Sequence, residues 1–149
     1  MYKTQKAIIA HLNQAGNATI KPVPAQFRAE TIKEYEGEFT GTMRGGNTFP
    51  AILVLYRDGS ALEQLPDLRF ELFFVSDNKY HDSELAKKHA LQMAEPYCEF
   101  LSYNRRFEDD YGYYEITEAN SSRLTTMISN HKWCVMSLNP VIVSVDRHL

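Results

Sequence analysis

Cysteine is scarce in this sequence, which contains only Cys98 and Cys134 among its 149 residues. Two cysteines are too few for a disulfide framework, and no Cys-x-x-Cys pair is present to bind zinc. We therefore expect two reduced thiols packed in the interior of a cytoplasmic protein. A single bridge between the two stays an alternative, because the sequence alone does not place their Cα atoms within bonding distance.

Long apolar runs are also missing. The longest extends from Ala51 to Tyr56, whereas a helix that spans a bilayer needs about 20 apolar residues. The first residues, Met1 to Lys6, lack the apolar stretch of a secretory signal peptide. The formal net charge is −3 with histidine neutral, and lysine and arginine are scattered. Because nucleic-acid-binding domains normally carry a basic face, we expect neither a membrane partner nor specific nucleic-acid binding.

Sequence signatures of catalysis are absent as well. The chain has no His-Glu-x-x-His, no Gly-x-Ser-x-Gly and no glycine-rich phosphate loop. Among the five histidines, His81 and His89 are the pair close to an acidic residue, Asp82. The acidic run from Glu108 to Asp110 is typical of a solvated surface. We predict no catalytic residue, no cofactor and no metal. A small hydrolase or metal enzyme is kept as a third interpretation, with His81, Asp82 and His89 as its first candidates.

Apolar residues are nevertheless plentiful enough for one folded domain. They make up 44% of a chain of 149 residues, a length that suits one domain, so we predict a single α+β domain over 1–149. Apolar stripes at helical spacing predict helices from Gln5 to Gln14 and from Pro24 to Glu36. A third and longest helix is predicted from Ser83, as its cap, to Tyr103, with a kink or restart at Pro96.

Glycine is concentrated between Gly37 and Asn47, where four of the seven glycines lie. Little apolar burial there opposes the entropy of fixing the chain. We therefore expect a flexible loop at 37–49 that becomes ordered against a partner.

Two pairs of strands follow from the apolar pattern. Ala51 to Arg57 and Leu68 to Ser76 are predicted to form an antiparallel pair. Leu124 to Ile128 and Trp133 to Val145 are predicted to form a hairpin. Asn139-Pro140 interrupts the last strand, and we place it at a sheet edge or bulge because proline lacks the N–H that a ladder needs. The predicted fold class is α+β, a mixed, mainly antiparallel sheet of about four strands with two or three helices packed on it.

Tyrosine is the one chemically distinctive feature, with nine copies beside eight phenylalanines. Four of them, Tyr103, Tyr111, Tyr113 and Tyr114, surround a polar connection. Tyrosine is enriched in protein–protein contacts. Two interpretations stay open, a contact surface for a partner and a roof over the domain's own core.

The order of these elements resembles a family of small proteins encoded among the tail genes of Mu-like phages and prophages. The resemblance runs from the helix around Ile8-Ile9-Leu12, through the strands Ala51–Tyr56 and Leu68–Val75, to the long helix and the hairpin with Trp133. The arrangement is also similar to that of the tail-terminator proteins of long-tailed phages, the lambda tail protein U type.

The resemblance implies a small α+β subunit that forms a homo-oligomeric ring, usually of six copies, at the end of the tail tube. It implies a structural tail-terminator or tail-completion role, with tail-tube and head-joining proteins as partners. The chain would then lie in the bacterial cytoplasm during assembly and in the virion tail of an active phage. That family has no catalytic residues to carry over. As contacts between copies we predict Arg44, Gly45, Gly46, Tyr111, Tyr113, Tyr114, Asn139 and Pro140.

A non-enzymatic bacterial adaptor or binding module is the second interpretation, because it shares the lack of catalytic motifs. Oligomeric state and neighbouring genes separate the two. A ring in solution, or flanking genes for tube, sheath or baseplate proteins, would favour the tail protein.

Overall fold

The computed structural model describes residues 2–35, 50–59, 67–76, 82–119, 123–129 and 132–148, and the side chains at 58, 59, 83, 118, 123–129 and 132–139 lie outside that description. The described part contains two α-helices and seven β-strands. In chain order they are α1 (Tyr2–Asn13), β1 (Thr31–Glu34), β2 (Ala51–Gly59), β3 (Asp67–Val75), α2 (Ser83–Tyr103), β4 (Arg106–Glu108), β5 (Gly112–Ala119), β6 (Arg123–Ser129) and β7 (Lys132–Arg147). Two 3₁₀ turns, Ala15–Asn17 and Ala25–Phe27, lie between α1 and β1.

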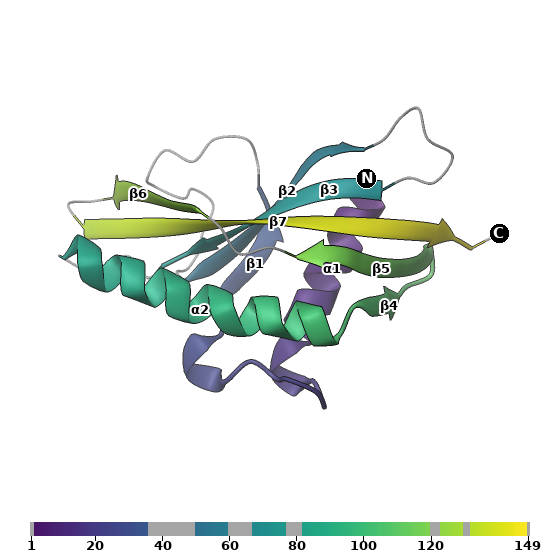
Figure 1. Cartoon of the computed structure of the whole chain (residues 1–149), viewed down its shortest axis with the longest axis horizontal. Coiled ribbons are helices and arrows are strands. Elements are labelled where there is room, and N and C mark those ends of the chain that lie inside the picture. Colours follow the sequence, from purple (N-terminus) through teal and green to yellow (C-terminus); the bar gives the residue numbers. More distant parts are fainter. Residues whose placement is uncertain are drawn as a thin grey trace.

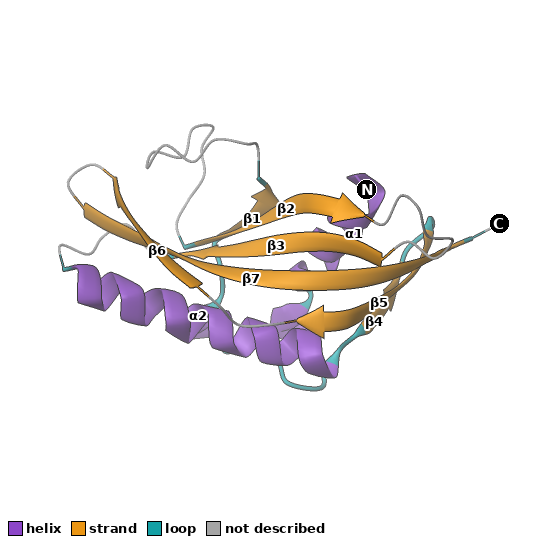
Figure 2. Cartoon of the chain, turned by 45° about the horizontal axis from the view of Figure 1, so that its top comes forward, coloured by secondary structure: helices purple, strands orange, loops and turns teal. Residues whose placement is uncertain are grey.

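All the described strands belong to one mixed sheet in the order β1-β2-β3-β7-β5-β4, with β6 also paired to β7. The long strand β7 is central. On one side β3 pairs with it from Met136 to Ser144. On the other side β5 pairs with Val141 to Arg147 and β6 pairs with Lys132 to Leu138. β5 and β6 therefore lie one after the other along β7, as Figure 2 shows. The pairing of β1 with β2 is parallel and the other five pairings are antiparallel.

The core lies between one face of this sheet and the two α-helices, of which α2 runs along β7 in Figure 1. Strand side chains alternate between faces, so β3 directs Phe70, Leu72 and Phe74 toward the helices, where all three are buried. The fully buried Ala86 and Ala90 leave room for α2 to lie close to the sheet. The helices contribute the buried side chains Ile8, Leu12, Met93, Ala94, Tyr97, Phe100 and Leu101.

The opposite, outer face of the sheet changes character from one end to the other. Toward β1 it is apolar and buried, with Leu53 at 3% and Phe73 at 5% exposure. Tyr35 stacks on Phe73 with the ring centroids 5.0 Å apart. Toward β4 the outward residues Glu115 and Asp146 are exposed. The two ends of this face therefore offer different chemistry.

Helix α2 begins one residue earlier than the predicted cap, Ser83, would place it, so Ser83 is the first residue of the helix. Its N-cap is Asp82, whose carboxylate Oδ1 accepts the backbone N–H of Glu84 at 2.8 Å. At its other end, the backbone N–H of Asn104 donates to the carbonyl of Phe100 at 2.8 Å. Pro96 lies inside one continuous helix, so the helix does not restart there.

The predicted helix from Pro24 to Glu36 is wrong. Pro24 has an extended backbone, with φ −59° and ψ 146°, and is followed by a single 3₁₀ turn. Thr31–Glu34 then forms β1 beside β2. The apolar pattern was misleading because Phe27 and Ile32, from different elements, pack against the same core.

The α+β class and the mainly antiparallel sheet are confirmed, while the strand number is higher than the expected four or so. The additional strands are β1, β4 and β5. β5 occupies the stretch from Gly112 to Ala119, where no strand was predicted. The expected flexible loop at 37–49 lies outside the described residues.

Candidate functional site

The predicted contact residues fall into three groups. Arg44, Gly45 and Gly46 lie outside the described residues. The three tyrosines are described and have unequal exposure. Tyr113 is 55% exposed, Tyr114 is 2% exposed and Tyr111 is half-buried. Tyr113 is therefore the member of this trio that presents most of its ring to the outside, and Tyr114 belongs to the core.

The turn between β4 and β5 is organised by one carboxylate. Oδ1 of Asp109 accepts the backbone N–H groups of Tyr111 at 2.9 Å and Gly112 at 3.1 Å. The same oxygen accepts the hydroxyl of Tyr114 at 3.0 Å. Burial, and then this hydrogen bond, raises the pKa of Tyr114, which keeps its phenol protonated. We refer to residues 108–114 together with His148 as the β4–β5 corner.

Tyr111 connects the β4–β5 corner to α1 and to the end of β7. The ammonium of Lys3 in α1 lies 4.8 Å from the centroid of its ring, and the guanidinium of Arg147 in β7 lies 5.9 Å from it. Both distances are within the range of a cation–π contact. The backbone N–H of His148 donates to the Tyr111 carbonyl at 2.9 Å. Tyr111 is thus engaged within its own chain.

The outer face beside the β4–β5 corner holds a shallow hollow of about 360 Å³. Its outward side chains come from β4, β5 and β7, and Arg106 pairs with Glu115 at 3.5 Å. The lining comprises Arg106, Phe107, Glu108, Tyr113, Tyr114, Glu115, Ser144 and Asp146. Three carboxylates against one guanidinium make the hollow acidic, and its chemistry suits a cationic group.

Asn139 and Pro140 do not lie at a sheet edge, contrary to the prediction. In β7 they pair with Leu72 and Glu71 of the neighbouring strand β3. On the other side of β7, the pairs with β5 end at Val141 and the pairs with β6 begin at Leu138. Proline lacks an N–H to donate, and it falls where the ladder passes from β5 to β6. Pro140 is therefore accommodated at the break between β5 and β6, and not at an edge of the sheet.

The hairpin of β6 and β7 extends beyond the rest of the sheet. β3 stops pairing at Met136, which lies opposite Val75. From that level outward, positions 132–135 of β7 pair with positions 126–129 of β6. We name these two segments the arm, and Figure 2 shows it reaching past the ends of β2 and β3. Five of its eight residues are apolar, namely Met127, Ile128, Trp133, Cys134 and Val135.

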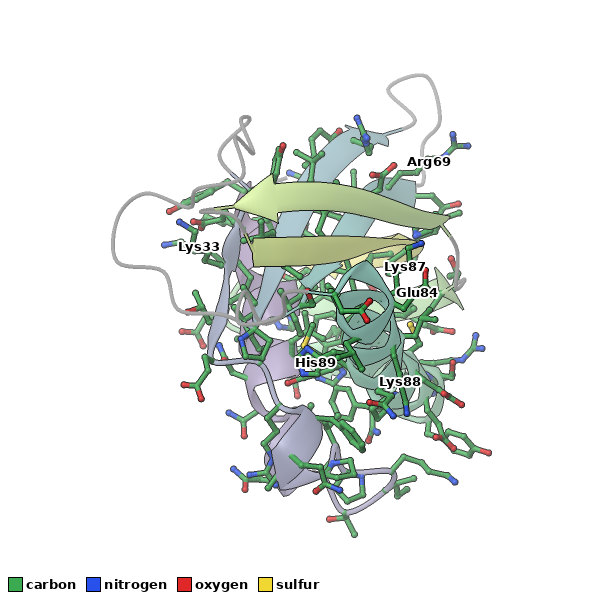
Figure 3. All side chains as sticks on the ribbon, turned by 90° about the vertical axis from the view of Figure 1, so that its left-hand side faces the viewer. Lys33, Arg69, Glu84, Lys87, Lys88 and His89 are labelled. Carbon is green, nitrogen blue, oxygen red and sulfur yellow. The ribbon has the colours of Figure 1, made fainter. Side chains whose placement is uncertain are left out.

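The outward side of α2 combines charge with exposed leucine. Leu85 is 52% exposed and Leu91 is 47% exposed. Lys87 pairs with Glu84 at 3.2 Å on the same helix. Figure 3 shows these charged side chains and Lys88 around the start of α2, away from the Lys33 side of the sheet. The exposed leucines make this surface a second place where a partner could pack.

The residues kept for a metal or hydrolytic site do not form a described cluster. His81 lies outside the described residues, Asp82 caps α2, and His89 is half-buried on that helix. Within the described ranges, no three His, Cys, Asp or Glu side chains are grouped so that they could hold a metal ion. Burial raises the pKa of Cys98 to about 11, so its thiol stays protonated near neutral pH. Neither α-helix of the described part is long and apolar enough to span a membrane.

Sequence reasoning missed the role of Asp109 at the β4–β5 corner. Asp109 and Gly112 bracket the turn, and their side-chain and backbone bonds close it. Aspartate at the first position and glycine at the fourth position of a four-residue stretch is a turn signal. That signal was present, but β4 has only three residues and left no alternation to recognise.

Comparison with known proteins adds no relative. No protein-family model matches the chain, and no curated protein matches its sequence.

Proposed function

We propose that this chain is a structural subunit of a phage or prophage tail, a tail-terminator or tail-completion protein. In this proposal it acts by forming a homo-oligomeric ring at the end of the tail tube. The observation that carries the proposal is the arm, two strands that extend past the sheet to which they belong. The proposal also rests on the order of helix, strand pair, long helix and hairpin that resembles tail-terminator proteins.

A projecting arm is best explained by a contact with another subunit. A two-stranded ribbon is marginally stable in water by itself and needs packing against another element. In the described part, α2 lies against β7 and β6 on one face of the hairpin. A neighbouring copy or the tube would pack against the arm and would bury its apolar residues.

Several polar side chains that looked available for chemistry instead hold the fold together. Asp109 closes the β4–β5 corner. Arg28 donates from Nε to the Val23 carbonyl and from a terminal nitrogen to the Gly16 carbonyl, each at 3.1 Å. The Tyr97 hydroxyl accepts the backbone N–H of Ala29 at 2.9 Å. Such use of polar groups favours a rigid building block that works by contact.

Deletion of the gene from an inducible prophage or phage tests this function. Without the subunit, we expect tubes of irregular length that fail to join heads, measured by negative-stain electron microscopy and by infective titre. Expression of the chain in trans should restore both. Tails of normal length and titre in the deletion strain would contradict the proposal.

A shortened arm provides the matched variant. Replacing residues 127–134 by Asn-Gly joins the paired positions Thr126 and Val135 through a favoured two-residue hairpin turn. This variant should melt cooperatively yet fail to restore tail length. Gln26→Ala, an exposed change between α1 and β1, should restore it fully. A shortened arm that restores tails as well as Gln26→Ala would remove the arm from the function.

The adaptor interpretation predicts different results for the same strains. An adaptor would leave tail length and titre unchanged on deletion. It would also give no ring in sedimentation experiments across a wide range of concentration.

A further inference from the structure

Three strands of the sheet have one described partner each, and two of them, β1 and β6, lie on opposite sides of the sheet. β1 pairs with β2, and β6 pairs with β7, among the strands that the structure describes. Outer strands present a row of backbone N–H and C=O groups that can template a further strand. β4 is a third outer strand, but it has three residues and carries Arg106 and Glu108. Shortness and charge are the usual protection of an edge.

β6 lacks that protection. It has seven residues, Arg-Leu-Thr-Thr-Met-Ile-Ser, with one charge at its first position and neither proline nor lysine. A long edge strand of this composition is the kind that pairs with another chain. β6 is therefore the edge most suited to strand addition in the described sheet.

The register places β1 and the first half of β6 at the same level of the sheet. Lys33 pairs with Leu53, which pairs with Phe73. Phe73 pairs with Leu138, which pairs with Arg123. Following the ladder across the sheet thus leads from Lys33 to Arg123. Both positions lie on the outer face of the sheet, in the same cross-strand row as Leu53 and Phe73.

The two edges also run in opposite directions. β1 is parallel to β2, and each of the next three steps, to β3, β7 and β6, is antiparallel. An odd number of reversals leaves β6 antiparallel to β1. Rotation about an axis along the strands preserves strand direction, so it would bring β1 of one copy beside β6 of the next as an antiparallel pair.

We propose that β1 of one copy adds to the outer edge of β6 of the next copy, in a head-to-tail antiparallel pairing that joins their sheets. The inference rests on the proposed ring and names one contact within it, at positions 123–125 of β6 next to the arm. A heterologous contact of this kind closes into a ring when its rotation allows. Pairing β6 with β6 across a two-fold axis would instead leave both β1 edges without a strand partner.

Charge and stagger select the register. Cross-strand pairs share a face, so an outer-face residue of β1 must meet an outer-face position of β6. Lys33 opposite Arg123 would place like charges together, whereas a shift of two residues sets Lys33 opposite Thr125. That shift brings Tyr35, the residue after β1, opposite Arg123. Closing strands around an axis requires such a stagger.

Cysteine cross-linking tests the pairing directly. Directly opposed residues in antiparallel strands have Cα atoms about 4.5–5.5 Å apart, within the range of a disulfide. In a background with Cys98→Ser and Cys134→Ser, Lys33→Cys with Thr125→Cys should convert most of the monomer into a ladder on a non-reducing gel. Glu34→Cys with Leu124→Cys, a pair in the same register, should do likewise.

The controls use the same strands. Each single-cysteine variant should stay uncross-linked, and Lys33→Cys with Thr126→Cys, one position out of register, should give little product. A covalent dimer from Thr125→Cys alone would show two-fold pairing of β6 and overturn the head-to-tail inference. Thermal melts show whether each variant is folded. Two cysteine pairs are tested, so the experiment still gives a result if one of the variants does not fold.

Sedimentation of the reduced protein separates this inference from the proposed function. Oligomers without a ladder from either pair would overturn strand addition and leave a ring built by another contact. A monomer at every concentration, with no ladder, would overturn the inference as well. The tail-length assay then judges the proposed function by itself.

Discussion

The imidazole of His11 in α1 stacks on the ring of Phe107 in β4, with centroids 4.2 Å apart and planes 8° from parallel. Its Nε2–H donates to the backbone carbonyl of Asn104 at 2.7 Å. Phe100 of α2 lies against the same ring at 4.9 Å. One imidazole therefore joins the first helix to the end of the second helix and to an edge strand. Burial lowers the pKa of His11 below its usual value of 6.5, and the bond to Asn104 opposes that effect.

The lowered pKa makes stability depend on pH with a definite sign. The unfolded chain binds a proton at His11 more readily than the folded chain, so the contribution is full above pH 6.5 and is lost as pH falls below it. We expect the free energy of unfolding to fall from pH 7.5 to pH 5 more steeply for the wild type than for His11→Gln. Urea unfolding of both proteins at pH 7.5 and pH 5 measures these free energies. Subtracting the change in His11→Gln from the change in the wild type removes the contribution of the other titrating groups. Parallel losses in the two proteins would show that His11 is not the cause.

Elements with a continuous local pattern were predictable from sequence. β3 alternates over Leu68 to Leu72, and α2 repeats its buried residues at helical spacing. β1 was not, because its stability comes from pairing with β2, which is distant in sequence. The alternation of β5 over 113–117 was present but short, and it was overlooked. Thr31–Glu34 is half-buried throughout, which gives no alternation to recognise.

The candidate site was less predictable than the fold. Tyr113 and Tyr114 are adjacent in sequence but lie on opposite faces of β5, so one is exposed and the other is core. That difference could not be assigned before β5 was recognised as a strand. Pro140 was placed at an edge because the transition from β5 to β6 along β7 is a tertiary feature.

The carboxylate of Asp109 should be the main stabilising group of the β4–β5 corner. Asp109→Ala removes the acceptor of three hydrogen bonds and leaves the Tyr114 hydroxyl without that partner. Tyr114→Phe removes one of them and should cost about 1 kcal/mol of unfolding free energy. Asp109→Asn keeps an oxygen acceptor and should cost less than Asp109→Ala. Urea unfolding of the three variants and of the double variant Asp109→Ala with Tyr114→Phe gives the coupling energy. Additive losses in the double variant would contradict the bond.

Thr4 offers a stabilising substitution. Its side chain is 1% exposed, and its hydroxyl oxygen has no hydrogen-bond partner among the described groups. A buried hydroxyl without a partner costs free energy that an apolar group of the same shape avoids. Thr4→Val should therefore raise the unfolding free energy by about 1 kcal/mol, seen as a higher melting temperature. Thr4→Ser keeps the hydroxyl and loses a methyl group, so it should lower stability. A loss of stability in Thr4→Val would mean that the hydroxyl is bonded in solution.

Two glycines differ in what an added methyl group would meet, and this difference can be measured. A Cβ at Gly112 would lie 2.6 Å from the backbone oxygen of Asp146 and 3.2 Å from Cα of Arg147. Backbone atoms of a paired strand cannot move aside, so Gly112→Ala must push β5 away from β7. A Cβ at Gly16 would lie 2.7 Å from the guanidinium of Arg28, which is the end of a flexible side chain. Arg28 can withdraw, at the expense of its two bonds to backbone carbonyls.

We therefore expect Gly112→Ala to lower the unfolding free energy by about 2 kcal/mol and Gly16→Ala to lower it by less. Both substitutions reduce the entropy of the unfolded chain equally, so their difference reports the native state. Urea unfolding of the two variants against the wild type measures it. Equal destabilisation by the two changes would mean that β5 can separate from β7 as easily as a side chain can turn.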